Sequence, residues 1–99
     1  MFRSINCGDV RISNEGEVVT LSGWVHRRRD HGGLIFIDIR DREGLVQVVF
    51  NPELDKDIHT KAQDLRSEWV ISVVGKVTQR PDGTKNRNMD TGEIEVLAT

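Results

Sequence analysis

Hydrophobic and polar residues alternate along several short stretches of this chain, a pattern typical of half-buried β-strands. Five stretches alternate in this way or are rich in β-branched residues, namely 18–27, 34–40, 44–50, 70–77 and 92–97. Gly32-Gly33 and residues 41–44 supply tight turns, and a longer loop opens at Pro81. The pattern therefore predicts five strands, with antiparallel hairpins at the short turns.

Residues 52–66 follow a different rhythm, because their apolar residues recur at near-helical spacing. Asn51 is suited to the N-cap and Pro52 to the first helical position. We therefore predict one helix over 52–66. Its apolar face would consist of Leu54, Ile58, Ala62 and Leu65.

The order of three strands, a helix and two strands is that of the OB-fold, an all-β, five-stranded Greek-key barrel with a helix between strands 3 and 4. Another small β-barrel, or a sandwich with one helix, fits the same order. The 99 residues suffice for one domain, residues 1–99, and are too few for a nucleotide-dependent catalytic fold of the usual size.

Side chains alternate between the two faces of a strand, so position assigns each residue to the core or to the surface. Three isoleucines alternate along the second stretch and are expected to face the core. Phe36 lies between the first two of them and is therefore expected to face outward. By the same rule, Gln47 and Glu95 face outward from the third and the last strand. The residues expected in the core of these three strands are Ile35, Ile37, Ile39, Val46, Val48, Phe50, Ile94 and Val96.

Charge is nearly balanced overall but unevenly distributed. The net charge of -2 excludes a protein that binds any polyanion through its bulk charge. Residues 27–42 and 76–88 are nevertheless locally basic and include Arg27, Arg28, Arg29 and Arg80. An aromatic platform, cations for phosphates and a few polar groups for base edges are what unpaired bases require. These residues together predict a surface for single-stranded nucleic acid.

No motif for catalysis or metal binding is present. The single cysteine, Cys7, cannot form an internal disulfide and is expected to be an inert, partly buried thiol. The histidines lack metal-ligand spacing, and Asp38 and Asp41 each lie beside an arginine and a turn, which favours ion pairs or turn caps. Trp24 and Trp69 are expected at the core or its edge.

Apolar runs are far shorter than the ~20 residues of a membrane span, and the Met1 end lacks an apolar signal region. The sequence therefore predicts a soluble protein with no membrane partner, and its single cysteine indicates a cytoplasmic one.

Residues 23–44, GWVHRRRDHGGLIFIDIRDREG, followed by VQVVF at 46–50 and GEIEV at 92–96, closely resemble the N-terminal domain of bacterial-type aspartyl-tRNA synthetases of class II. The likeness covers nearly the whole chain and includes Cys7-Gly8. The asparagine and lysine synthetases share a looser version of the motif and are the nearest alternatives.

The resemblance implies an anticodon-binding OB-fold, non-catalytic and without a cofactor of its own. It would precede a domain, absent here, that activates aspartate with ATP and magnesium. The full-length protein would be an aspartate-tRNA ligase, a cytoplasmic homodimer, and this domain would bind the anticodon stem-loop of tRNA-Asp.

The resemblance also implies roles for individual residues. Phe36 would stack on the middle anticodon base, uridine, with Arg29 and Gln47 assisting. Glu95 would read the first base, guanine or queuine, while Arg80 and Asn86 would approach the third base, cytidine. Arg27 and Arg28 complete the expected RNA-binding set.

His31 and Gly83 suggest relaxed discrimination, because family members that charge both tRNA-Asp and tRNA-Asn resemble this chain at these two positions. Binding of tRNA-Asn is therefore a further expectation. Two other functions fit the residues: a sequence-neutral module for single-stranded nucleic acid, and a structural domain whose exposed Phe36 contacts protein.

Overall fold

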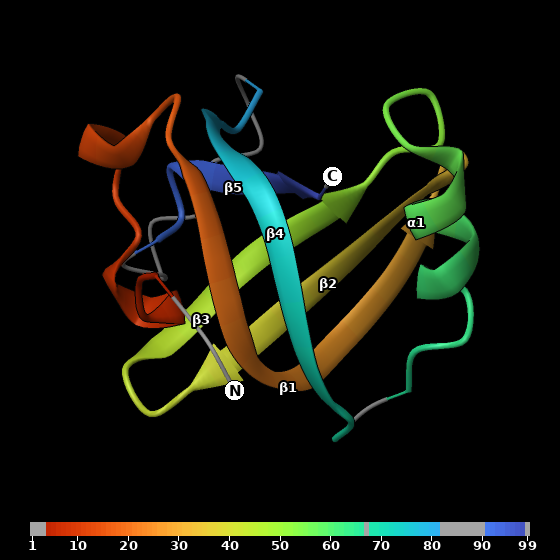
Figure 1. Cartoon of the computed structure of the whole chain (residues 1–99), viewed down its shortest axis with the longest axis horizontal. Coiled ribbons are helices and arrows are strands. Elements are labelled where there is room, and N and C mark those ends of the chain that lie inside the picture. Colours follow the sequence, from red (N-terminus) through yellow and green to blue (C-terminus); the bar gives the residue numbers. More distant parts are fainter. Residues whose placement is uncertain (1–3, 67, 82–90, 99) are drawn as a thin grey trace.

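Five strands form a closed barrel in the computed structural model, which describes residues 4–66, 68–81 and 91–98 (Figure 1). The strands lie around the barrel in the order β1-β2-β3-β5-β4, and β4 closes it against β1. The predicted five-stranded barrel, with its helix between the third and fourth strands, is confirmed. The elements are the 3-10 turns Cys7–Asp9 and Ile12–Asn14, β1 (Val18–His31), β2 (Leu34–Asp41), β3 (Gly44–Phe50), α1 (Lys56–Ala62), β4 (Val70–Gln79) and β5 (Ile94–Ala98).

β1 is the longest strand and bends so that it serves two neighbours (Figure 1). Its first half pairs antiparallel with β4 and its second half pairs antiparallel with β2. A β-bulge between Val25 and Arg27 shifts the register within the pairing with β2. At the bend, a Cβ on Gly23 would lie 2.3 Å from the carbonyl oxygen of Arg40, so only glycine lets the two strands approach this closely.

The interior is apolar and mostly aliphatic, as the alternation of residues predicted. Every residue expected in the core of β2, β3 and β5 is at most 3% exposed. Cys7 is buried as well, and its backbone N–H donates to the Asp41 carboxylate at 2.7 Å. Asp41 also accepts from the N–H of Glu43, which confirms the turn cap expected there. No helix among the described residues is long and apolar enough to cross a membrane.

The helix is shorter than predicted. α1 begins after Asp55, whose carboxylate accepts from the N–H of Ile58 and is the true N-cap. Asn51, the predicted cap, instead accepts from the N–H of Glu53 and closes a separate turn before the helix. The first strand also continues four residues past Arg27, to His31, because Gly32 and Gly33 adopt positive φ and close the hairpin there.

Trp69 does not pack in the core. It is 50% exposed in the segment that leads into β4, and its backbone carbonyl, rather than its ring, holds it in place by accepting from the N–H of Val25. Trp24 is partly buried on β1, as expected of a residue at the edge of the core. The molecule therefore carries an exposed aromatic ring at Trp69 that the sequence analysis missed.

Candidate nucleic-acid interface

Phe36 lies on the outer face of β2, where it lines a hollow of about 460 Å³. Its ring is partly exposed, which confirms the predicted outward orientation. Arg29, its partner on β1, holds the guanidinium carbon 5.8 Å from the centre of the ring. This distance permits a cation–π contact. The residues that line the hollow are Arg29, Asp30, His31, Phe36, Gln47 and Arg80.

Gln47 joins this hollow from β3, and its amide is already oriented. The Arg29 guanidinium donates from Nη2 to Gln47 Oε1 at 2.8 Å. Gln47 faces outward as predicted, yet only 5% of it is exposed. Because Oε1 is engaged, the amide NH₂ group of Gln47 is the part left to donate to a ligand.

Asp38 belongs to the same face, because it lies two positions after Phe36 on β2, although it was not among the predicted RNA-binding residues. It pairs with Arg27 on β1 and with Gln47 on β3, in the middle of the sheet. One carboxylate oxygen, Oδ1, lies 3.9 Å from Arg29 Nη2 and has no hydrogen-bond partner among the described residues. The ion pair expected of Asp38 is confirmed, and it helps to hold Arg29 over Phe36.

Glu95 and Arg80 form the buried, charged side of this face. Glu95 precedes Val96, which pairs with Val48, so it lies next to Gln47 across the β3–β5 pair. Only 7% of Glu95 is exposed, and this burial raises the pKa of its carboxyl while Arg80 opposes the shift. Burial likewise lowers the pKa of Arg80, against the attraction of Asp38 and Glu95. Arg80 is therefore partly shielded from solvent and is attracted by the carboxylates of Asp38 and Glu95. Its Nε donates to the Ile94 carbonyl at 3.0 Å.

Arg28 points away from the face that its two arginine neighbours share. It pairs with Ile37, and its guanidinium donates to the carbonyls of Gln63 and Leu65, at 2.6 and 3.2 Å, just beyond α1. Asp30 accepts from the same guanidinium, and this bond raises the pKa of Arg28. The structure therefore places Arg28 apart from the other residues that were predicted to bind RNA.

The other predicted residues lie as follows. Arg27 is exposed and shares its face with Asp38. His31 is exposed at the end of β1 and lines the hollow. Gly83 and Asn86 lie outside the described residues. The structure thus brings together Arg29, Phe36, Gln47, Arg80 and Glu95, with Arg27 and His31 at the margin.

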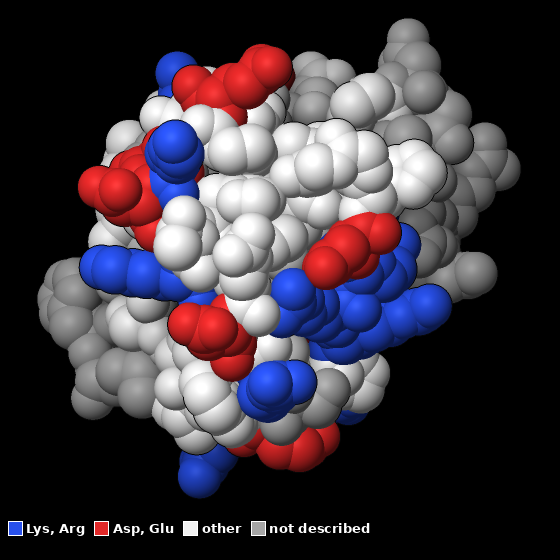
Figure 2. All heavy atoms as spheres, turned by 90° about the vertical axis from the view of Figure 1, so that its right-hand side faces the viewer, with Lys and Arg blue, Asp and Glu red and all other residues white. Residues whose placement is uncertain are grey.

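The chemistry of this face suits an unpaired base. It combines an aromatic platform, guanidinium and amide donors, and a carboxylate acceptor. Arginine and lysine side chains also gather at one edge of the side that carries α1 (Figure 2). The described residues contain no cluster that could hold a metal ion. Fold and face together define a small OB-fold module for binding single-stranded nucleic acid.

The particular family follows from comparison with known proteins. Residues 19–99 match the family of tRNA anticodon-type OB-fold nucleic acid binding domains, and the chain belongs to this family. It is 59% identical over 96 residues to the aspartate–tRNA(Asp/Asn) ligase of Heliobacterium modesticaldum, and 62% identical over 97 residues to that of Magnetococcus marinus. These matches cover 97% and 98% of this chain but only 16% of each relative.

Solved structures agree on the fold. The asparaginyl-tRNA synthetase of Pyrococcus horikoshii superposes with a TM-score of 0.81 at 30% identity, over 99% of this chain and 22% of that one. A lysozyme-bound OBody superposes with a TM-score of 0.83 at 18% identity, which shows the fold alone. The chain is therefore similar to the anticodon-binding domain of these synthetases and spans 16% of the length of the two curated relatives.

Proposed function

We propose that this domain binds the anticodon loop of tRNA-Asp, and of tRNA-Asn as well, for a parent aspartate-tRNA ligase. The parent would be a cytoplasmic homodimer whose catalytic domain uses ATP and magnesium. In this proposal, residues 1–99 are one domain that takes no part in catalysis. The observation that carries the proposal is the partly exposed ring of Phe36, flanked by Arg29 and Gln47.

The middle anticodon base, uridine, would stack on Phe36. Since Gln47 Oε1 accepts from Arg29, the Gln47 amide NH₂ is available to donate. The carbonyl oxygens of uridine are acceptors, whereas cytidine presents an amino donor in place of one of them. A donor fixed at this position therefore favours uridine. Arg29 and Arg27 would add contacts to phosphates, which contribute affinity without base selectivity.

Glu95 and Arg80 would contact the anticodon bases on either side of the middle base. A carboxylate accepts from the imino and amino donors of guanine, the first anticodon base, and this suits Glu95. Arg80 would approach the third base together with Asn86. Burial raises the pKa of Glu95, so its acceptor capacity depends on pH more than that of an exposed glutamate.

Relaxed selection at the third base would let one domain serve both tRNAs, whose anticodons differ there as cytidine or uridine. His31 at the margin of the hollow and Gly83 are the residues proposed for this tolerance. The names of the two bacterial relatives, which include both tRNAs, support the proposal. Stem-loops with the two anticodons should bind this chain within about threefold of each other. A strong preference for the tRNA-Asp anticodon would contradict relaxed selection.

Chemical-shift mapping with an anticodon stem-loop tests the interface. The largest shifts should fall on Arg29, Phe36, Gln47 and Glu95, and a stem-loop with cytidine as its middle base should bind more weakly. Equal competition by oligo-dT would indicate a sequence-neutral module instead. Self-association that rises with concentration, without RNA-induced shifts, would indicate a protein contact at Phe36.

A further inference from the structure

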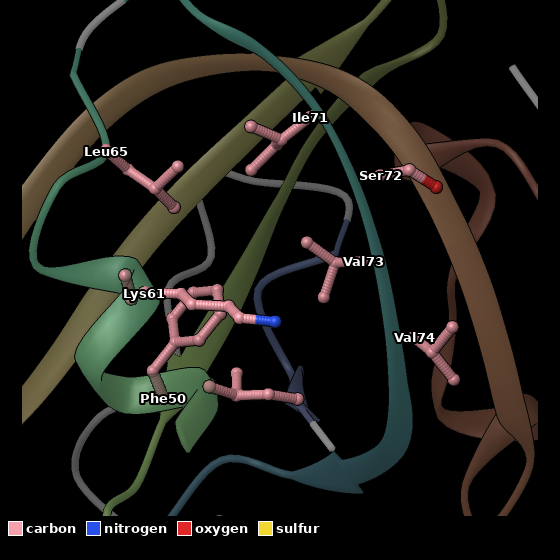
Figure 3. Close-up of a pocket in the computed structure, with 9 residues that line it drawn as sticks. Phe50, Lys61, Leu65, Ile71, Ser72, Val73 and Val74 are labelled. Atoms are coloured by element: carbon pink, nitrogen blue, oxygen red, sulfur yellow. The ribbon is translucent and has the colours of Figure 1, made fainter. Parts of the chain in front are cut away.

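The carboxylate of Asp38 takes no direct part in the proposed contacts with RNA, yet it lies next to residues that do. A hollow of about 340 Å³ between α1 and β4 is lined mainly by apolar side chains, with Lys61 as its one charged residue (Figure 3). The hollow of Phe36 differs from it, because charged and polar side chains surround the ring. Asp38 does not line that hollow. Its side chain is 14% exposed and lies opposite Gln47 across the β2–β3 pair.

The base preference proposed for Gln47 depends on which end of its amide faces the ligand. A half-turn of the amide exchanges the oxygen and the NH₂ group and leaves the shape of the side chain unchanged. With the NH₂ group toward the ligand, Gln47 donates to uridine; with Oε1 toward the ligand, it would accept from the amino group of cytidine. Arg29 selects the first orientation, because its Nη2 donates to Oε1 at 2.8 Å and a guanidinium offers no acceptor for the NH₂ group.

Contacts rather than burial hold the Arg29 side chain, since 45% of it is exposed. Asp38 Oδ1 lies 3.9 Å from Nη2, the nitrogen that donates to Gln47. This separation is beyond hydrogen-bond distance, and Oδ1 has no hydrogen-bond partner among the described residues. The attraction between Asp38 and Arg29 therefore depends on charge. The burial of the carboxylate strengthens it, because little water screens the pair.

We propose that Asp38 is a positioning residue for base selection: its negative charge holds Arg29 against Gln47 and so keeps the Gln47 NH₂ group directed at the ligand. This inference rests on the proposed function and adds a residue that acts on the base only through its neighbours. Without the charge, Arg29 would be free to turn toward solvent or a phosphate. The Gln47 amide would then present either end, and uridine and cytidine would bind alike.

The substitution Asp38→Asn tests this role, because it removes the charge and keeps the shape of the side chain. The measured quantity is the ratio of Kd for two anticodon stem-loops that differ only in a middle cytidine or uridine. The native chain should prefer uridine by about five- to tenfold, as expected of one neutral hydrogen bond, and Asp38→Asn by less than about twofold. The ratio decides rather than Kd itself, since Asp38 also attracts Arg80, and loss of that attraction would affect both stem-loops equally.

Asp30→Asn is the matched control. It makes the same chemical change at a carboxylate that also lines the hollow of Phe36 but forms its ion pair with Arg28, at 3.0 Å, instead of Arg29. The preference for uridine should be the same in Asp30→Asn as in the native chain. A preference that persists in Asp38→Asn, or that falls equally in both variants, would overturn the role of Asp38.

A measurement on the free protein tests the same arrangement without RNA. The heteronuclear NOE of the Gln47 side-chain nitrogen and of Arg29 Nε reports how firmly the two groups are held. Both values should fall in Asp38→Asn and stay unchanged in Asp30→Asn. Unchanged values in Asp38→Asn would show that Asp38 does not hold the pair and would overturn the inference.

The outcome is separable from that of the proposed function. If the native chain binds neither stem-loop, the proposed function is refuted, and the NOE values still decide whether Asp38 holds Arg29 and Gln47. If the native chain and Asp38→Asn both bind RNA with the same preference for uridine, the role of Asp38 alone is refuted. Equal binding of the two stem-loops by the native chain would refute base selection by Gln47 together with the role of Asp38.

Discussion

Replacing Phe36 by alanine removes the aromatic platform and leaves the rest of the interface in place. The ring is partly exposed on the outer face of β2, and the isoleucines on either side of it form the core without it. The substitution also ends the contact between the ring and the Arg29 guanidinium, 5.8 Å from the ring centre. The hydrogen bond from Arg29 to Gln47 does not depend on the ring. The variant should therefore fold and lose mainly base stacking.

The expected loss follows from the energy of one stacked base. Stacking on an aromatic side chain contributes about 1–3 kcal/mol, which corresponds to an increase in Kd of about five- to 150-fold. The substitution removes no charge that contacts a phosphate. The slope of log Kd against log salt concentration should therefore stay the same in the variant.

Fluorescence anisotropy with a labelled anticodon stem-loop, at three salt concentrations, measures both quantities. Trp69→Ala is the matched control, since Trp69 is a half-exposed aromatic residue that does not line the hollow of Phe36. It should change Kd by less than twofold. A similarly small change for Phe36→Ala, or an equal loss in both variants, would refute the assignment of Phe36 as the stacking platform.

Three further predictions concern Arg28, Glu95 and Gly23. Arg28→Gln should lower the free energy of unfolding by about 1 kcal/mol, because it removes hydrogen bonds to the two carbonyls beyond α1. In fluorescence anisotropy its Kd for RNA should change by less than threefold. A larger loss of affinity would show that Arg28 contacts RNA. Glu95 has a raised pKa in the folded state, so the folded protein binds the proton more tightly than the unfolded chain does. As pH falls from this raised value to the ordinary glutamate value, urea unfolding should show the native protein gaining stability relative to Glu95→Gln; a constant difference would contradict this. Gly23→Ala forces a Cβ against the Arg40 carbonyl and should lower the free energy of unfolding, measured by heat or urea, by about 2 kcal/mol or more. An unchanged unfolding midpoint would show that the two strands can move apart at this position at no cost.

The barrel could be predicted from the sequence because its strands obey simple alternation. Ile35, Ile37 and Ile39 leave Phe36 no place in the core, and the structure agrees. The burial of Gln47 and Glu95, 5% and 7% exposed, could not be predicted in this way. Alternation gives the face of a residue, whereas burial on that face depends on which long side chains from other strands lie over it.

The helix shows a different limit. Asn51 and Asp55 are both good N-cap residues, and local sequence does not decide between them. The choice depends on where the chain leaves β3 and must close over Phe50, which is set by tertiary structure. A turn capped by Asn51 comes first after β3, and the helix begins only after Asp55.

The bulge in β1 decides which arginine lies on the face of Phe36, and three consecutive arginines in a sequence give no sign of it. Val25 faces the core, and unbroken alternation would turn Arg27 and Arg29 inward with it. The bulge adds one residue between Val25 and Arg27, so the parity changes. Arg29 then meets Phe36 on the outer face, and Arg28 turns to the carbonyls beyond α1. One inserted residue thus divides adjacent, chemically identical side chains between the proposed RNA-binding face and a structural contact beyond α1.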